Sequence, residues 1–308
     1  MDLPQDLKEK IEFLLGQEKI ALLTQSAQKL TARYRSPQGV KTFLESRADH
    51  LAYLLTRMPA TYAALRHVLK TVKQPIGSLL DVGAGPGTGG IAAREEFPAL
   101  QRIVCLEKDR EFISLGKEIL SLAEWRPFDL CHDRLTGEVF DLVLCSYAIN
   151  ELPADKQLAA LETLWQATGK VLVIVEPGTP AGFARIRQMR EKLLSWGAHM
   201  VAPCPHANDC PVAGSDWCHF AERVERSSLH RRLKGAELNY EDEKFSYIVV
   251  SRTAVVLPES RIIRRPQKCD GHVKLTLCTQ AGLQNIVVTK KTKDLYKQAR
   301  KSEWGSDI

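Results

Sequence analysis

The sequence predicts an α/β fold with a mainly parallel sheet. Four short apolar runs alternate with amphipathic stretches, and strands separated by helices in this way are joined by crossover connections. A glycine-rich loop directly follows the first run, and such loops bring bare backbone to the carboxyl edge of an open sheet. The runs that we expect to form strands are residues 78–82, 102–107, 140–146 and 170–176.

Helical spacing of apolar side chains predicts helices on either side of these runs. The spacing extends over residues 7–70, with Ser36-Pro37 as a helix-start signal. Pro180 begins a later helix with an apolar stripe that is typical of core packing. The stripe consists of Phe183, Ile186, Met189 and Leu193, whereas Arg185, Arg187, Arg190 and Lys192 are expected to lie elsewhere on the helix.

Two further patterns complete the expected fold. Residues 245–252 are predicted to form another strand, and residues 273–278 and 283–289 alternate at period two across a glycine-containing turn, which predicts a hairpin. We therefore expect a helical region at 1–72, a central domain at 73–255 with an insertion at about 199–220, and a basic, β-rich extension at 256–308.

Composition and charge narrow the class of protein. A chain of 308 residues with 44% hydrophobic content can bury one large core, or one core with a smaller appendage. The first sixteen residues carry four acidic side chains and no long apolar run, so we expect no signal peptide and no membrane anchor, and a cytoplasmic protein. The net charge of +6 is uneven, because residues 260–301 hold eleven Lys or Arg against two Asp. A basic tail of this kind is typical of a protein that binds phosphate groups, such as those of a nucleic acid. The alternative is that the charges only keep this face of the protein solvated.

The glycine-rich loop is the first candidate site. Asp81 ends the first strand, and Gly83, Gly85 and Gly87 follow it. A P-loop is excluded because no Gly-Lys-Ser/Thr follows. A dinucleotide fingerprint stays open in the frame that ends at Gly90, but an S-adenosylmethionine loop is favoured because G-x-G-x-G comes straight after the strand.

Glu107 supports a nucleoside ligand at the same edge. It ends the second expected strand, where a carboxylate can accept hydrogen bonds from ribose hydroxyls. Because this geometry is shared with NAD sites, Glu107 does not choose between the two cofactors.

The cysteines form the second candidate site. Cytosolic thiols stay reduced, so eight cysteines are not expected to form a disulfide framework. Cys204, Cys210 and Cys218 are spaced C-x5-C-x7-C in a turn-rich segment and need a fourth ligand to close a four-coordinate site. Structural zinc uses tighter pairs, so the spacing favours an iron-sulfur cluster, with zinc and metal-free buried thiols as alternatives. The available fourth ligands are His206, His219, Cys269 and Cys278.

Together these segments resemble the methyltransferase-like family of small-ribosomal-subunit assembly factors found in bacteria and mitochondria. The matching strings span nearly the whole chain and include LLDVGAGPGTGG, SYAINELP, VIVEPGTPAGF, CPHANDCP with WCHF, LKGAELNYEDEKFSYIVVSR and RRPQKCDGHVKLTLC. The resemblance implies a seven-stranded methyltransferase fold that binds S-adenosylmethionine, a four-cysteine [4Fe-4S] site and association with small-subunit ribosomal RNA. It also implies Cys278 as the fourth ligand, with Cys269 as the alternative.

The sequence leaves the reaction itself open. The Asp/Asn-Pro-Pro-aromatic motif of amino-methyltransferases is absent after the strand at 140–146, so no catalytic residue is assigned. Tyr147 and Asn150 are expected to face the reacting centre, with packing and helix capping as the alternatives. The expected function is a ribosomal RNA methyltransferase or a non-catalytic assembly factor that is monomeric when free. An NAD-dependent oxidoreductase with an electron-carrying cluster is the third interpretation.

Overall fold

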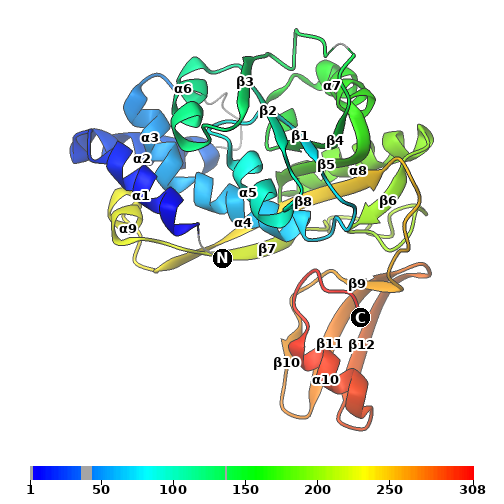
Figure 1. The fold of residues 1–308 in the computed structure, drawn as a ribbon. Helices are drawn as coiled ribbons and strands as arrows, with labels where there is room; N and C mark the ends of the chain where they lie inside the picture. The colour runs from blue at the N-terminus through cyan, green and yellow to red at the C-terminus, as the bar shows by residue number, and fades with distance from the viewer. Residues whose placement is uncertain (1–2, 36–43, 136) are drawn as a thin grey trace.

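The computed structural model describes residues 3–35, 44–135 and 137–308 of the chain. Its larger part is a mixed sheet with helices on both faces, and its smaller part is a separate antiparallel sheet near the C-terminus (Figure 1). Where the chain is described, no helix is long and apolar enough to cross a membrane.

Seven strands of the larger sheet lie in series in the order β3-β2-β1-β4-β5-β8-β6, and β7 pairs with the first half of β8. The first five are parallel to one another, and β8 is antiparallel to β5. The strands are β1 (Ser78–Val82), β2 (Arg102–Glu107), β3 (Glu124–Pro127), β4 (Phe140–Ser146), β5 (Thr168–Pro177), β6 (His199–Ala202), β7 (Phe220–Glu225) and β8 (Tyr240–Ser251). The seven-stranded methyltransferase-like α/β fold that the resemblance implies is confirmed.

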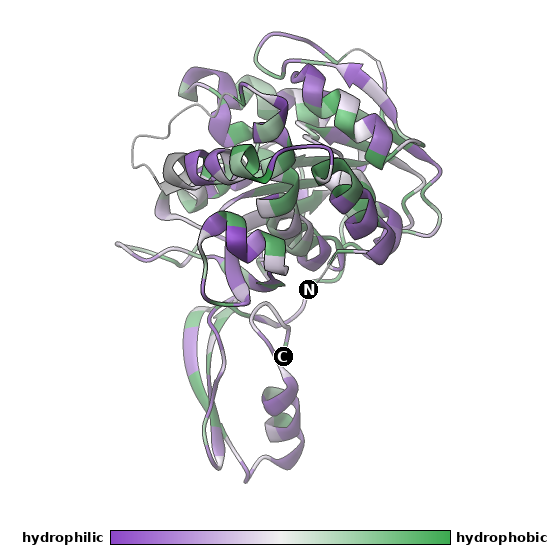
Figure 2. Cartoon of the chain, turned by 90° about the vertical axis from the view of Figure 1, so that its left-hand side faces the viewer, coloured by the Kyte–Doolittle hydropathy of each residue, from purple (hydrophilic) through white to green (hydrophobic). Residues whose placement is uncertain are grey.

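Each central strand is apolar on both sides, because helices cover both faces of the sheet. Leu79 on β1 packs into a core formed with the N-terminal helices, whereas its neighbour Leu80 packs into the core on the opposite face. Figure 2 shows these apolar strands enclosed between helices with hydrophilic outer faces. The first face is covered by α1 (Gln5–Leu15), α2 (Ile20–Arg35), α3 (Arg47–Thr56), α4 (Met58–Leu69), α5 (Thr88–Glu96), α6 (Arg110–Ile119) and α9 (Ser228–Lys234), and the second by α7 (Ala154–Gln166) and α8 (Pro180–Ser195).

The C-terminal unit, residues 260–308, is built on the predicted hairpin. Its strands β11 and β12 pair in register from His272 with Thr289 to Thr279 with Gly282, so the hairpin is confirmed. A small core of its own holds α10 against the sheet, and the unit projects from the larger part of the molecule (Figure 1). Its elements are β9 (Ser260–Ile262), β10 (Gln267–Lys268), β11 (His272–Thr279), β12 (Gly282–Thr289) and α10 (Lys293–Lys301).

Several expectations change in the structure. The helix-start signal at Ser36-Pro37 lies outside the described residues. The short strands β3, β6 and β7 carry too little periodicity to be predicted. On α8, Ile186, Met189 and Leu193 of the apolar stripe are buried as expected, and Phe183 is partly buried. Arg190 does not lie apart from the packed surface, because it is only 4% exposed. Its guanidinium reaches backbone carbonyls of the cysteine segment, which offsets the cost of burial.

Candidate functional site

The glycine-rich loop lies at the carboxyl edge of the sheet between β1 and α5, beside the point where the strand order reverses. Gly83, Gly85 and Gly87 all have positive φ, at 69°, 54° and 91°, so three left-handed residues shape the loop. A Cβ on Gly83 would lie 2.5 Å from the Cβ of Ala148, whereas Gly85 faces open space. The bare backbone that the sequence predicts is therefore present.

Two buried carboxylates support this loop. One oxygen of Asp81 accepts a hydrogen bond from the Gly90 amide at 3.2 Å, and its Oδ1 has no partner among the described residues. Burial raises the pKa of Asp81 to about 7. Asp81 therefore stabilises the start of α5 from beneath the loop.

The carboxylate of Glu107 accepts more hydrogen bonds within the protein than the sequence suggests. It is 7% exposed, and its carboxylate accepts hydrogen bonds from the amides of Gly85, Lys108 and Asp109 at 2.7–2.9 Å. A carboxylate has about four acceptor positions, so about one remains for a ribose hydroxyl. Burial raises the pKa of Glu107, and these amide bonds oppose the rise.

Tyr147 and Asn150 follow β4 as expected, but the Tyr147 hydroxyl is used inside the molecule, whereas the Asn150 side chain is exposed. Tyr147 is the only non-glycine residue with positive φ, 55°, in the part of the chain that the structure describes. Its hydroxyl donates to Glu243 on β8 at 3.2 Å, and Glu243 also contacts Arg57 at 3.5 Å. The backbone amide of Asn150 donates to the buried Glu176.

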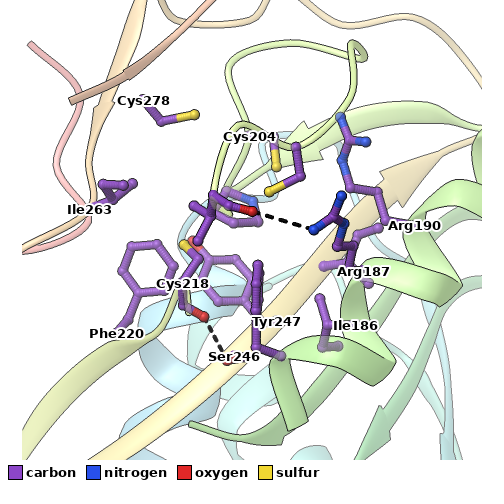
Figure 3. Close-up of a pocket in the computed structure, with 15 residues that line it drawn as sticks. Ile186, Arg187, Arg190, Cys204, Cys218, Phe220, Ser246, Tyr247, Ile263 and Cys278 are labelled. Atoms are coloured by element: carbon purple, nitrogen blue, oxygen red, sulfur yellow. Dashed lines mark hydrogen bonds between the residues drawn. The ribbon is translucent and has the colours of Figure 1, made fainter. Parts of the chain in front are cut away.

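The second site is a pocket between α8, the segment after β6 and the C-terminal unit. All four predicted cysteine ligands line it: Cys204, Cys210, Cys218 and Cys278. The first three come from the irregular segment 203–219, and Cys278 comes from β11. In Figure 3, Cys278 projects from the C-terminal sheet toward Cys204. The topology thus brings together thiols that are far apart in the sequence.

The alternative fourth ligands lie differently. Cys269 belongs to the β10–β11 turn, where its amide donates to the carbonyl of His272, and it is not part of the pocket lining. His219 stacks on Trp217, with ring centroids 5.2 Å apart. The Nε2 atom of His206 lies 3.4 Å from the Sγ of Cys278, so this imidazole ring contacts one of the four thiols.

The thiols favour their neutral form in the absence of a bound cation. Burial raises the pKa of Cys218 well above its ordinary value, and the neighbouring thiols Cys204 and Cys210 add to the rise. Burial likewise raises the pKa of Cys278 to about 12. A positively charged inorganic centre would supply the charge that makes thiolates stable here.

The spacing of the donors bears on which centre could fit. Across residues 3–35, 44–135 and 137–308, no three His, Cys, Asp or Glu side chains are close enough to hold a single metal ion. Tetrahedral zinc at about 2.3 Å from each sulfur would need thiolates roughly 3.8 Å apart. The four cysteines therefore line one pocket without forming a preformed single-ion site among the described residues.

The cysteine segment also joins the C-terminal unit to the rest of the molecule. Arg264 binds both carboxylate oxygens of Asp216 at 2.6 and 2.7 Å. Trp304 packs edge-on against His219 with ring centroids 5.0 Å apart, so this tryptophan pins the chain terminus. Sequence reasoning missed two residues beside the thiols, Arg190 and Arg261, because an arginine carries no signal of burial in a polar segment.

Comparison with known proteins identifies the family. The family model described as "Mitochondrial small ribosomal subunit Rsm22" matches residues 47–308. The chain is 28% identical over 361 residues to Rsm22-cox11 tandem protein 2, mitochondrial, of Schizosaccharomyces pombe, covering 97% of this chain and 48% of that protein. It is 27% identical over 291 residues to the human ribosome assembly protein METTL17, mitochondrial, covering 83% of this chain and 61% of that protein. The chain thus spans about half to three fifths of the length of these relatives.

Solved methyltransferase structures are also similar to the chain, at low identity. A TehB-like SAM-dependent methyltransferase from Corynebacterium glutamicum has a TM-score of 0.41 and 17% identity, covering 74% of this chain and 98% of that one. The plantazolicin methyltransferase in complex with SAH has a TM-score of 0.42 and 13% identity, covering 77% and 99%. Because the family model extends from α3 to the last residue, well over half of the sequence, this chain belongs to the Rsm22 family of the mitochondrial small ribosomal subunit.

Proposed function

We propose that this chain acts in assembly of the small ribosomal subunit as a methyltransferase-like protein that binds S-adenosylmethionine, small-subunit ribosomal RNA and a [4Fe-4S] cluster. The cluster ligands are Cys204, Cys210, Cys218 and Cys278. Family membership supports the assembly role. The observation that carries the cluster is the single pocket lined by four cysteines from two parts of the fold.

The donor set favours an iron-sulfur cluster over zinc. All four donors are thiols, and they surround a cavity rather than a point. When bound, a cluster supplies four iron–sulfur bonds that join the segment 203–219 to β11. The residues of the chain then orient the C-terminal unit: Arg264 bridges to Asp216, and Trp304 packs on His219.

The C-terminal unit supplies the phosphate-binding surface. Its exposed lysines lie on β10, on β11, in the turn after β12 and on α10, where long side chains can reach a nucleic-acid backbone. They are Lys268, Lys274, Lys290, Lys291, Lys293, Lys297 and Lys301. Arg264 is already paired with Asp216 and contributes less.

The cluster is tested on protein purified without oxygen, by visible absorption with iron and sulfide analysis. We expect a brown protein with about four iron and four sulfide per chain. Cys278→Ser should lose the chromophore, whereas the matched control Cys269→Ser, outside the pocket, should keep it. Colourless wild-type protein without iron would overturn the cluster assignment, and zinc in its place would select the alternative metal.

RNA binding is tested with transcribed small-subunit ribosomal RNA at several salt concentrations. Neutralising Lys268, Lys290, Lys291 and Lys293 with Gln should flatten the salt dependence, by up to about 0.9 in logarithmic slope for each phosphate group that the protein no longer neutralises. Neutralising the exposed Arg231 and Arg232 on α9 is the control. An unchanged slope in the lysine variant would remove the C-terminal unit from RNA binding.

The choice between enzyme and assembly factor is made in a deletion strain. Loss of a methyl group from small-subunit RNA selects the methyltransferase, and unchanged RNA with stalled subunits selects the non-catalytic factor. The internal hydrogen bond of Tyr147 to Glu243 and the three amides on Glu107 favour binding without turnover. Titration with S-adenosylmethionine and with NAD separates both from the oxidoreductase interpretation.

A further inference from the structure

Two arginines beside the cysteine pocket are more deeply buried than any other lysine or arginine whose side chain is described. Arg190 on α8 is 4% exposed and Arg261 on β9 is 8% exposed. Throughout residues 3–31, 44–135 and 137–308, every other Lys or Arg is at least partly exposed. Burying a guanidinium is unfavourable unless a countercharge accompanies it. The burial of two of them beside one pocket therefore calls for a cause.

Arg190 reaches the pocket from its α8 side. One of its terminal nitrogens donates to the carbonyls of His206 and Asn208, at 3.0 and 2.7 Å, and its Nε has no partner in the described structure. Arg190 lines the same pocket as Cys204 and the other three thiols. Its charge therefore lies beside the thiol set.

Arg261 lies beside the pocket, on the C-terminal unit, without being part of the pocket lining. It is the ladder partner of Cys278 between β9 and β11. Its Nε donates at 3.1 Å to the carbonyl of Pro203, next to Cys204, and another nitrogen donates at 2.9 Å to the carbonyl of Gly305. The second buried charge thus lies on the opposite side of the thiols from α8.

Neither guanidinium has a carboxylate partner in the part of the chain that is described. Carbonyl oxygens accept hydrogen bonds from some of their N–H groups but leave two buried positive charges uncompensated. The remaining source of negative charge at this place is the sulfur set itself, once its protons are displaced.

We infer that Arg190 and Arg261 are the countercharges of a dianionic tetrathiolate centre. The inference rests on the proposed function, because it assigns these residues toward the cluster. Four thiolates around a [4Fe-4S] core that carries two positive charges have a net charge of two minus, which two guanidinium groups neutralise. Both arginines are positioning residues, because they donate hydrogen bonds to backbone carbonyls of the segment 203–219. Their positive charges also stabilise the reduced, more negative state of the centre, which an apolar pocket would not.

Arg187 provides a matched control. It lies one turn before Arg190 on α8 and also lines the pocket, but its side chain is 42% exposed and is paired with Glu191. Solvent and Glu191 screen its charge, so Arg187→Gln should leave the properties of the centre close to those of the wild type.

The test measures the reduction potential of the cluster, by dye-mediated titration followed in the visible spectrum, in the full-length protein. We expect Arg190→Gln and Arg261→Gln each to disfavour the reduced form at least tenfold, which is about 59 mV for one electron. Arg190→Lys keeps the charge and should restore most of the difference, whereas a purely structural role would not distinguish Lys from Gln.

A second readout is the rise in thermal unfolding temperature when the metal-free protein is loaded with iron and sulfide. Each variant is compared with its own metal-free form, so a loss of stability that is common to both forms cancels in this difference. We expect the rise to be smaller in both Gln variants than in the wild type, Arg190→Lys and Arg187→Gln.

The outcomes separate the two proposals. Wild-type protein that takes up no iron and sulfide refutes the proposed cluster and the role of the arginines with it. A loaded wild type with unchanged potential and unchanged loading rise in both Gln variants refutes the arginine role alone. An equal shift in Arg187→Gln would also refute it, because burial would then not matter.

Discussion

His50 on α3 provides the sharpest test of how the N-terminal helices are attached to the carboxyl edge of the sheet. The residue is 4% exposed, and its ring is held between two acceptors. Its Nδ1 lies 2.8 Å from the carbonyl oxygen of Ser46, and its Nε2 lies 3.0 Å from the Oδ2 of Asp109. Both ring nitrogens must therefore donate, so the ring is an imidazolium.

This charge has a clear effect on stability. Burial opposes it, but the hydrogen bonds to Asp109 and Ser46 raise the pKa of His50 above its ordinary value of 6.5. Burial also acts on Asp109, but the hydrogen bond from His50 outweighs it and lowers the pKa of that carboxyl below 3.8. The contribution from His50 is complete below pH 6.5 and is lost as pH rises through its raised pKa. The contribution from Asp109 is present above pH 3.8 and is lost as pH falls through its lowered pKa.

The magnitude follows from a double-mutant cycle of His50→Ala with Asp109→Asn, since Asn keeps the helix cap of α6. A hydrogen bond between charged partners contributes about 1.5–3 kcal/mol, so we expect a coupling energy of that size at about pH 6. At about pH 9 a neutral ring should leave about 0.5–1.5 kcal/mol. The assay is urea unfolding followed by circular dichroism.

The control links the same two helices. Arg47 on α3 pairs with Glu111 on α6, but both side chains are at least one third exposed. An exposed pair of this kind contributes about 0.2–1 kcal/mol. A His50–Asp109 coupling no larger than the Arg47–Glu111 coupling, or one that does not change between the two pH values, would refute the charged-histidine argument.

Three further predictions concern the two sites. Gly89→Ala should lower the unfolding free energy by about 1–3 kcal/mol, because the added Cβ would clash with Asp81 Oδ2. The control Gly16→Ala, whose added Cβ would have its nearest neighbour at 3.4 Å, should change the unfolding free energy by about 0.5 kcal/mol or less. Equal effects of the two substitutions would contradict the packing argument. Tyr147→Phe should cost about 1 kcal/mol by removing the bond to Glu243, measured by urea unfolding, and a neutral result would show the bond to be unimportant. Cluster loading, measured as iron content after reconstitution, should become weaker as pH falls, because burial raises the pKa values of the thiols and cluster binding displaces their protons. Loading that is independent of pH would contradict this prediction.

The expected cellular location stays a prediction. The sequence favours the cytoplasm, whereas the relatives from Schizosaccharomyces pombe and human are named as mitochondrial proteins. Imaging of the tagged chain in its own cells distinguishes the two.

Local patterns in the sequence determined the strands, the loop and the hairpin. The runs at 78–82 and 102–107 match β1 and β2 residue for residue, because a strand buried on both faces must be apolar along its length. Glycine spacing located the left-handed loop, since only glycine adopts three such positions at low cost. The cysteine spacing marked the segment 203–219 as a site because thiols are rare in exposed turns.

Tertiary structure alone decided which distant residues share a site. Cys278 lines the pocket and Cys269 does not, although the two are only nine positions apart in the sequence. The reason is that Cys278 lies on β11, on the side of the segment 203–219, whereas Cys269 lies in the turn before β11. The burial of Arg190 and the charge of His50 were likewise decided by partners many residues away. Periodicity records which side of an element is buried, but the partner on that side depends on how the layers pack, and no local pattern encodes it.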